Sequence, residues 1–239
     1  MEIGILIVGS LRWDPNPARR TWRRNRLRLK GAKLVSAPIR YGRRAHTRGD
    51  SYTIVFSEEL VRHGTMGTAL AVPCKQHVNG VADLIHEAEL LWAAERNTTT
   101  PNGHVSSPWG SCCLLVNPTK PLPREIHDKW LEYLRHEEWY GGLCRGVDEQ
   151  PVVNSQGFLA IPWPRCQDGS DLNLDCLVAT VTDPTLVANR YPTAQQIAAA
   201  WCTMAGRPYI NYFLNNQKHK ITTFQDEEIL AYLHRVGAA

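Results

Sequence analysis

The sequence predicts an α+β fold, with strands mainly in its first third and helices mainly in its last third. The chain opens with a continuous run of β-branched and aliphatic residues at positions 3–8, which is typical of a strand buried on both faces. Residues 79–96 carry apolar side chains every three or four positions, which indicates an amphipathic helix. The same spacing recurs after residue 190, so strands and helices are segregated along the chain.

Further strands are predicted from alternation and from β-branched content. Residues 51–57 alternate between two faces, and Tyr52, Ile54 and Phe56 share one of them. The triplet Arg-Gly-Asp at positions 48–50 predicts the turn before this strand. The other predicted strands cover residues 33–43, 67–72, 109–116 and 172–181.

Helices are predicted where apolar residues recur at helical spacing. Asp14 and Pro15 predict the start of a helix that continues to residue 24, because aspartate caps helices and proline fits their first turn. Residues 192–205 predict another helix, in which Met204 is among the side chains expected to face the interior. The other predicted helices cover residues 79–96, 122–139, 208–216 and 225–235.

The composition is that of a folded protein and excludes several classes. Hydrophobic residues make up 43% and charged residues 21% of the 239 residues, which argues against disorder. The sequence has no apolar stretch near the roughly 20 residues of a membrane-spanning helix, and Glu2 stands where a signal peptide would be positive. Seven cysteines without a C-x-x-C pair predict reduced thiols and a cytoplasmic location.

Positive charge is concentrated near the N-terminus. About half of the 27 Lys and Arg residues fall within residues 1–50, which hold only three acidic residues. The segment 19–48 could therefore attract nucleic acid, and Trp13 and Trp22 lie near its densest part, where they could stack on bases. The simpler alternative is a solvated basic face.

Glu95 is the candidate catalytic residue. On a helix through residues 79–96 it falls inside the apolar face, about 40° from Val81 at 100° per residue. Burial and the negative end of the helix dipole both disfavour a carboxylate, so we expect a raised pKa, which suits a proton shuttle. The alternative is that the helix ends one turn earlier and leaves Glu95 in water or paired with Arg96.

The second candidate element is Gly9-Ser10-Leu11, which follows the first predicted strand directly. Loops at the carboxyl ends of buried strands are common ligand sites. Glycine allows a close backbone approach, and free N–H groups there could hold a carboxylate or an oxyanion. The alternative is an ordinary turn without a ligand.

These pieces resemble, in their order, the motifs of the gamma-glutamylcyclotransferase family. That family has a strand ending in Tyr-Gly-Ser-Asn or Tyr-Gly-Ser-Leu, a Gly-x-Ala strand, a Leu-Asp-x-x-Glu-Gly segment with the catalytic glutamate, and a Gly-x-Pro turn before a tyrosine-bearing helix. The corresponding segments here are residues 8–11, 67–69, 91–96 and 206–208, followed by Tyr209 and Tyr212. This chain departs from the family at Val8 (for Tyr), Trp92 (for Asp) and Arg96 (for Gly).

The resemblance implies a fold and a reaction. The fold would be a mixed β-barrel or sheet with flanking helices, one domain over residues 1–239, with an insertion or remodelled segment around residues 98–180. The reaction would be an acyl transfer in which the α-amine of a γ-glutamyl amide attacks its own γ-carbonyl and releases 5-oxoproline and an amine. Glu95 would move the proton, and the small anionic substrate would contact Gly9, Ser10, Leu11, Tyr209 and Tyr212.

The resemblance implies no cofactor and no metal, and the sequence has no histidine pair at metal-ligand spacing. Two other functions stay open. The departures at Val8 and Arg96 favour a small-molecule-binding or regulatory protein of the same fold that has lost the reaction. The basic segment 19–48 leaves nucleic-acid binding as the weaker alternative.

Overall fold

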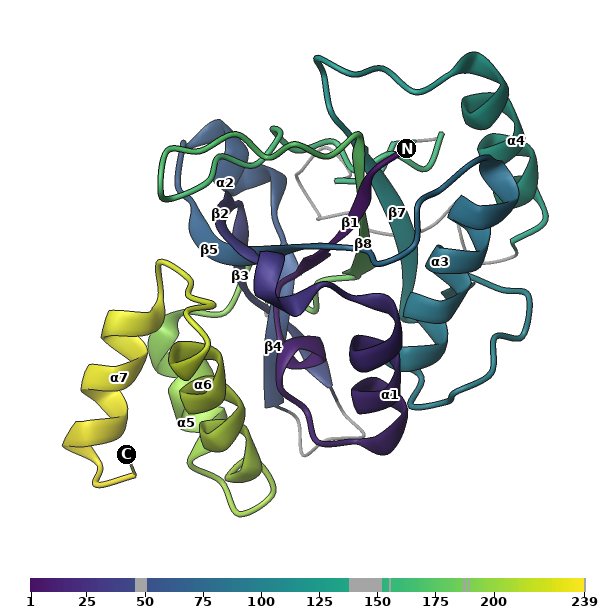
Figure 1. Ribbon diagram of the computed structural model, residues 1–239. Coiled ribbons are helices and arrows are strands. Elements are labelled where there is room, and N and C mark those ends of the chain that lie inside the picture. Colours follow the sequence, from purple (N-terminus) through teal and green to yellow (C-terminus); the bar gives the residue numbers. More distant parts are fainter. Residues whose placement is uncertain (46–50, 138–151, 155, 187, 189, 239) are drawn as a thin grey trace.

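The computed structural model describes residues 1–45, 51–137, 152–154, 156–186, 188 and 190–238, and the predicted turn at 48–50 therefore lies outside the described residues. The described residues form a mixed α+β fold, as the sequence predicts, with a six-stranded sheet, a two-stranded sheet and seven α-helices (Figure 1).

The six-stranded sheet has the order β2-β5-β1-β8-β7-β6. Only β1 and β8 run parallel to each other, and every other neighbouring pair is antiparallel. Every residue of β1 is buried, because this strand lies inside the sheet and is covered on both faces, as its continuous apolar run predicts. The strands are β1 Ile3–Ile7, β2 Lys33–Ala37, β5 Gly67–Pro73, β6 Ser106–Ser107, β7 Gly110–Val116 and β8 Cys176–Thr182.

The two-stranded sheet is an antiparallel pair formed by β3 Ile39–Ala45 and β4 Ser51–Phe56, with a register shift between Tyr41 and Arg43. Strand β3 contacts β5, and β4 contacts β8. Strands β5 and β8 flank β1 in the larger sheet, so the β3–β4 pair contacts the larger sheet on both sides of β1.

The helices gather on different sides of these sheets (Figure 1). Helices α5, α6 and α7 form one group beside β3 and β4, whereas α3 and α4 lie on the other side of the molecule. Helix α1 lies between these two groups of helices. Helix α3 packs against α1, α4, β7 and β8. The helices are α1 Pro17–Arg26, α2 Glu58–Arg62, α3 Val81–Glu95, α4 Arg124–Arg135, α5 Ala194–Trp201, α6 Pro208–Lys218 and α7 Asp226–Arg235, with 3-10 helices η1 Ser10–Arg12 and η2 Leu29–Gly31.

The start of α1 corrects the predicted cap. The helix begins at Pro17, and its cap is Asn16, whose side chain accepts hydrogen bonds from the backbone N–H groups of Ala18 and Arg19. Asp14 lies before the helix, where its carboxylate accepts from the Asn16 N–H at 2.8 Å. The prediction of Asp14 as the cap is therefore wrong, and the helix starts at Pro17 instead of Pro15.

The end of α5 corrects a second prediction. The helix ends at Trp201, which is fully buried, instead of continuing to residue 205. Met204 therefore lies beyond the helix and is 97% exposed, not inward-facing as predicted. None of the helices in the described part of the chain is both long and apolar enough to cross a membrane.

Candidate functional site

A pocket of about 420 Å³ lies where the carboxyl ends of β1 and β8 meet the β4 strand. The two carboxyl ends lie together because β1 and β8 are parallel, a position at which open α/β sheets often bind ligands. The end of α3 and the helix α6 also contribute residues to the pocket lining. The lining residues are Leu6, Val8, Gly9, Ser10, Leu11, Arg19, Arg43, Thr53, Ile54, Val55, Phe56, Glu95, Arg96, Asn97, Trp109, Thr180, Thr182 and Tyr212.

The structure thus brings five of the six predicted site residues to one pocket. Tyr209 is the exception, because it is buried in α6 and does not line the pocket. Its ring lies 5.7 Å from that of Tyr212 in a tilted arrangement, so its contribution is to the packing of Tyr212.

Gly9 is required by the close approach of Tyr212. The backbone of Gly9 is extended, with φ −171°, so any residue could adopt its conformation. A Cβ atom at this position, however, would lie 2.6 Å from the Tyr212 hydroxyl oxygen, well inside van der Waals contact. The absence of a side chain therefore lets α6 place the Tyr212 hydroxyl directly over the loop after β1.

Ser10 and Leu11 form the first turn of η1. The first hydrogen bond of this turn joins the Arg12 N–H to the Gly9 carbonyl at 3.2 Å. The N–H groups of Ser10 and Leu11 precede that bond, so they have no acceptor within the turn. Donors of this kind in a pocket wall suit a carboxylate or an oxyanion.

Glu95 is the last residue of α3, and its side chain is 19% exposed. The predicted helix end is thus confirmed to within a residue or two, and the alternative of an early helix end is wrong. Arg96, the neighbour that this alternative paired with Glu95, is exposed. The carboxylate instead meets Arg19, whose Nη2 lies 3.1 Å from Glu95 Oε2.

Arg19 is a residue of the candidate site that the sequence patterns did not single out. It is only 2% exposed and connects the loop after β1 to the end of α3. Its Nη1 donates to Ser10 Oγ at 2.9 Å and to Asp14 Oδ2 at 2.7 Å. Its Nε and Nη2 donate to the carbonyls of Ala94 and Glu95, both at 3.2 Å, so the cation also stabilises the C-terminus of α3.

Arg23 lies one turn further along α1 and holds the same loop. It is 8% exposed, and its guanidinium donates to the carbonyls of Leu11 and Asp14, each at 2.7 Å. Burial lowers the pKa of Arg23 from its ordinary value, and Asp14 opposes this shift. The sequence signal was available, because Arg19 and Arg23 are four residues apart and adjoin the buried Ala18 and Trp22 on one face of α1.

The Tyr212 hydroxyl is a weak acid in this setting. Burial raises the pKa of Tyr212 to about 12, while Asn216 and the backbone amide of Ile54 act in the opposite direction. Trp13 packs edge-on against the Tyr212 ring, and its Nε1 donates to Asn216 Oδ1 at 2.8 Å. Tyr212 therefore offers a neutral hydroxyl that can donate or accept a hydrogen bond.

Another part of the pocket lining carries an aromatic ring and a cation. Trp109 stacks on the buried Trp92, with ring centroids 4.6 Å apart. The guanidinium of Arg43 lies 5.1 Å from the centroid of the Trp109 ring, in cation–π contact. Arg43 and Arg96 add positive charge to the lining of the pocket, which suits an anionic ligand.

Two other kinds of chemistry find less support in the described residues. No group of three or more His, Cys, Asp or Glu side chains in this part of the chain is placed to hold a metal ion. Burial raises the pKa of the Cys112 thiol well above its ordinary value, so this cysteine is not an activated nucleophile.

The basic segment 19–48 does not form one free surface. Arg19 and Arg23 are buried as described above. Ion pairs with Glu87, Glu2 and Glu59 engage Arg26, Arg28 and Arg40, respectively. Residues 46–48 lie outside the described residues.

Comparisons of the chain with protein-family models, with curated proteins and with solved structures found no match.

Proposed function

We propose that this protein is a gamma-glutamylcyclotransferase-like enzyme, which converts a γ-glutamyl amide into 5-oxoproline and an amine. The observation that supports this most is the position of Glu95, which lines the same pocket as the loop Gly9-Ser10-Leu11. A carboxyl group and a set of backbone N–H donors facing one cavity are the parts that this reaction needs. The volume of about 420 Å³ fits a small amino-acid derivative.

In the proposed reaction, Glu95 takes a proton from the α-ammonium group of the substrate. The freed α-nitrogen attacks the γ-carbonyl carbon, and the oxyanion that forms accepts hydrogen bonds from the loop after β1. The bond to the leaving nitrogen then breaks as Glu95 returns a proton to it. Overall two protons pass from the α-nitrogen to the leaving nitrogen, so one carboxyl group relays them in turn.

The oxyanion donors would be the N–H groups of Ser10 and Leu11. Each such donor contributes about 3 kcal/mol to transition-state stabilisation in other acyl-transfer enzymes. Arg19 and Arg23 keep this loop in place through Ser10, Leu11 and Asp14, and we assign them a positioning role. The Tyr212 hydroxyl and Arg43 also line the pocket, and in this proposal they orient the polar ends of the substrate.

The experiment is a screen of γ-glutamyl amines and γ-glutamyl dipeptides, with release of 5-oxoproline measured by chromatography. We expect turnover with at least one of them, and a loss of about a hundredfold or more in Glu95→Gln, because the amide cannot carry the proton. Glu132→Gln is the matched control, since Glu132 is an exposed glutamate of α4. Full turnover by Glu95→Gln would exclude the proposed role.

The ion pair between Arg19 and Glu95 favours one alternative, a small-molecule-binding or regulatory protein of the same fold. A guanidinium 3.1 Å from Glu95 Oε2 holds this carboxylate in a structural contact, which accounts for its position without a catalytic role. This alternative predicts that calorimetry detects binding of a γ-glutamyl compound, that no 5-oxoproline is released, and that Glu95→Gln binds the compound as the wild type does.

A cytoplasmic location remains part of the proposal, on the sequence argument from reduced thiols. Nucleic-acid binding through residues 19–48 is the weaker alternative, because the arginines Arg19, Arg23 and Arg26 of that segment make contacts within the protein. It predicts an affinity for an oligonucleotide that falls steeply with salt concentration.

A further inference from the structure

A second hollow, which we call the basic groove, follows α1 and η2 on the outside of the molecule. It is bounded by side chains of α1, by η2, by Pro73 at the end of β5, by Lys75, and by residues 173–174 before β8. Its volume is about 1190 Å³, and it shares no lining residue with the candidate functional site. The groove is therefore a separate site from the pocket.

The charged side chains that line the basic groove are positive, with the exception of Glu2. Arg20, Arg24, Lys30 and Lys75 line it, and none of these four forms an ion pair with a carboxylate of the described residues. The acidic residue of the lining, Glu2, pairs with Arg28.

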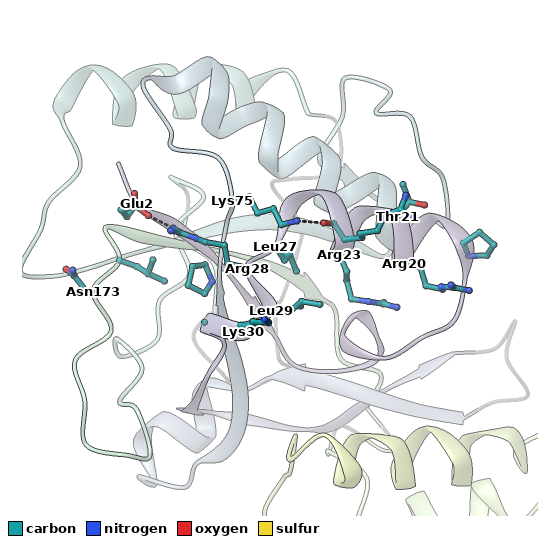
Figure 2. A pocket seen from close by; sticks show the side chains of 15 residues that line it. Glu2, Arg20, Thr21, Arg23, Leu27, Arg28, Leu29, Lys30, Lys75 and Asn173 are labelled. Atoms are coloured by element: carbon teal, nitrogen blue, oxygen red, sulfur yellow. Dashed lines mark hydrogen bonds and ion pairs between the residues drawn. The ribbon is translucent and has the colours of Figure 1, made fainter.

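These cations follow one another along the groove. Figure 2 shows Lys30 and Lys75 in the middle part of the groove and Arg20 towards one end, whereas Arg28, which pairs with Glu2, lies towards the other end. Lys75 Nζ donates to the carbonyl of Arg24, which fixes this cation at the C-terminal end of α1. A row of positive charges in a long groove suits an extended anionic chain better than a single small anion.

The floor of the basic groove is apolar. Leu27 and Leu174 are 2% and 3% exposed, and Leu29 and Pro73 are half-buried beside them. No aromatic side chain of the described residues lines the groove, so it lacks the stacking surfaces with which proteins bind single-stranded nucleic acid. An anionic chain that also carries aliphatic side chains matches both features.

We propose that the basic groove binds an acidic peptide segment of a partner protein. Asp or Glu side chains of the segment lie against Arg20, Arg24 and Lys75, and its aliphatic side chains pack on the leucines of the floor. Thr21 and Asn173 lie towards opposite ends of the groove and add uncharged hydrogen-bonding groups that fit peptide amides (Figure 2). The groove exceeds the roughly 300–1,000 Å³ of small-ligand pockets, which agrees with a chain-like ligand.

The test is a fluorescence anisotropy titration of the full chain with a labelled synthetic peptide in which Glu and Leu alternate. We expect binding that weakens with salt, because screening reduces the attraction between the charges. The double variant Arg20→Glu/Arg24→Glu should weaken binding at least about tenfold, because it reverses two charges of the row. The matched control Arg135→Glu/Arg235→Glu changes the same net charge at the exposed ends of α4 and α7, and we expect wild-type affinity.

A second experiment distinguishes the contribution of the apolar floor to peptide binding from the contribution of the cations. A peptide with Ser in place of Leu keeps the anionic groups, and we expect it to bind more weakly than the Glu-Leu peptide. Leu29→Gln should weaken the Glu-Leu peptide severalfold and leave the Glu-Ser peptide unchanged, because only the former packs on Leu29. Circular dichroism of each variant verifies that the fold is retained.

Several outcomes would overturn the proposal. One is that the Glu-Leu peptide does not bind, or binds Arg20→Glu/Arg24→Glu as well as the wild type. Another is that inorganic polyphosphate, an oligothymidine or phosphatidylglycerol vesicles bind more tightly than the peptide and displace it, which would assign the groove to a phosphate-bearing ligand. All of these measurements are made without substrate, so they are independent of the proposed reaction.

Discussion

The guanidinium of Arg19 lies 3.1 Å from the carboxylate of Glu95 and 2.9 Å from the hydroxyl of Ser10. One buried side chain thus connects the two elements of the candidate site, although Ser10 and Glu95 are far apart in the sequence. The position of the carboxylate relative to the loop after β1 depends on this contact, because α3 and the loop are separate elements.

Arg19→Lys should therefore lower both stability and activity. Lysine keeps the charge but has three donors on one nitrogen, so it cannot reach Ser10, Asp14 and Glu95 together. We expect a loss of about 2 kcal/mol in the free energy of unfolding, measured by urea denaturation, and a parallel loss of turnover.

Arg20→Lys is the control for this variant, since Arg20 is the exposed neighbour and should tolerate the change. Arg19→Met tests the charge itself. If its fold is retained, turnover should fall at least as far as in Arg19→Lys, because methionine removes the charge and the hydrogen bonds to Ser10, Asp14 and Glu95. A folded Arg19→Lys protein with wild-type turnover would contradict the positioning role.

Gly9→Ala should displace Tyr212, because the added Cβ would lie 2.6 Å from its hydroxyl oxygen. The next ring atom, Cζ, is 3.6 Å away, which is an ordinary contact. Removing the oxygen should therefore relieve the clash, and Gly9→Ala/Tyr212→Phe should be more stable than Gly9→Ala alone. In a double-mutant cycle by thermal unfolding we expect a coupling of about 1 kcal/mol or more. Additive effects would show that the two residues do not meet.

Gly67→Ala should destabilise the fold through a clash with backbone. A Cβ atom there would lie 2.3 Å from the Thr222 carbonyl oxygen, and this carbonyl accepts the Thr68 N–H at 2.8 Å. The backbone cannot yield as a flexible side chain would, so we expect a loss of about 2 kcal/mol in denaturant unfolding. Gly31→Ala is the control, because its nearest neighbour is a Pro73 side-chain atom at 3.6 Å. Equal stabilities of the two variants would contradict the packing of β5 against residue 222.

Asp226 should make stability depend on pH in the acidic range. Burial raises the pKa of Asp226 from 3.8 to about 6, despite hydrogen bonds from Thr223 and Gln217. The folded state then holds the proton more tightly than the unfolded state, so this contribution is present in full below about pH 4 and is lost as pH rises towards 6. The shift corresponds to about 3 kcal/mol.

Asp226→Asn should remove this slope, because the amide does not titrate. Urea unfolding of the wild type and the variant across this range gives the difference, and Glu227→Gln, an exposed neighbour on α7, should leave the slope unchanged. An identical pH dependence of the wild type and Asp226→Asn would show that Asp226 is not buried as described.

The sequence predicted most of the regular elements because their patterns are strong. The apolar run at residues 3–8 contains β1, and the periodic segment 79–96 contains α3 with Glu95 as its last residue. The ends were less predictable, since they depend on tertiary contacts. Strand β8 starts at Cys176 and not at residue 172. Its pairing with both neighbouring strands, β7 and β1, begins at Cys176. The five-residue helix α2 was not predicted.

The candidate site was predictable from its motif residues and not from its supporting contacts. Gly9 and Glu95 stand at positions that sequence patterns single out. The burial of Arg19 was not predicted, because a run of arginines resembles a solvated surface, and its partners come from both η1 and α3. The sequence could not show that Tyr209 lies outside the pocket. Tyr209 and Tyr212 are three residues apart in α6 and their rings are neighbours, but only Tyr212 lines the pocket.

The parallel pairing of β1 with β8 bears on the order in which the chain can fold. Strand β1 is synthesised long before one of its two neighbours, β8, which begins only at Cys176. Until β8 emerges from the ribosome, one edge of an entirely apolar strand stays unpaired, and such edges promote misassociation. A nascent chain that stops before residue 176 should therefore require chaperone protection, and pairing this distant in sequence should make refolding slow.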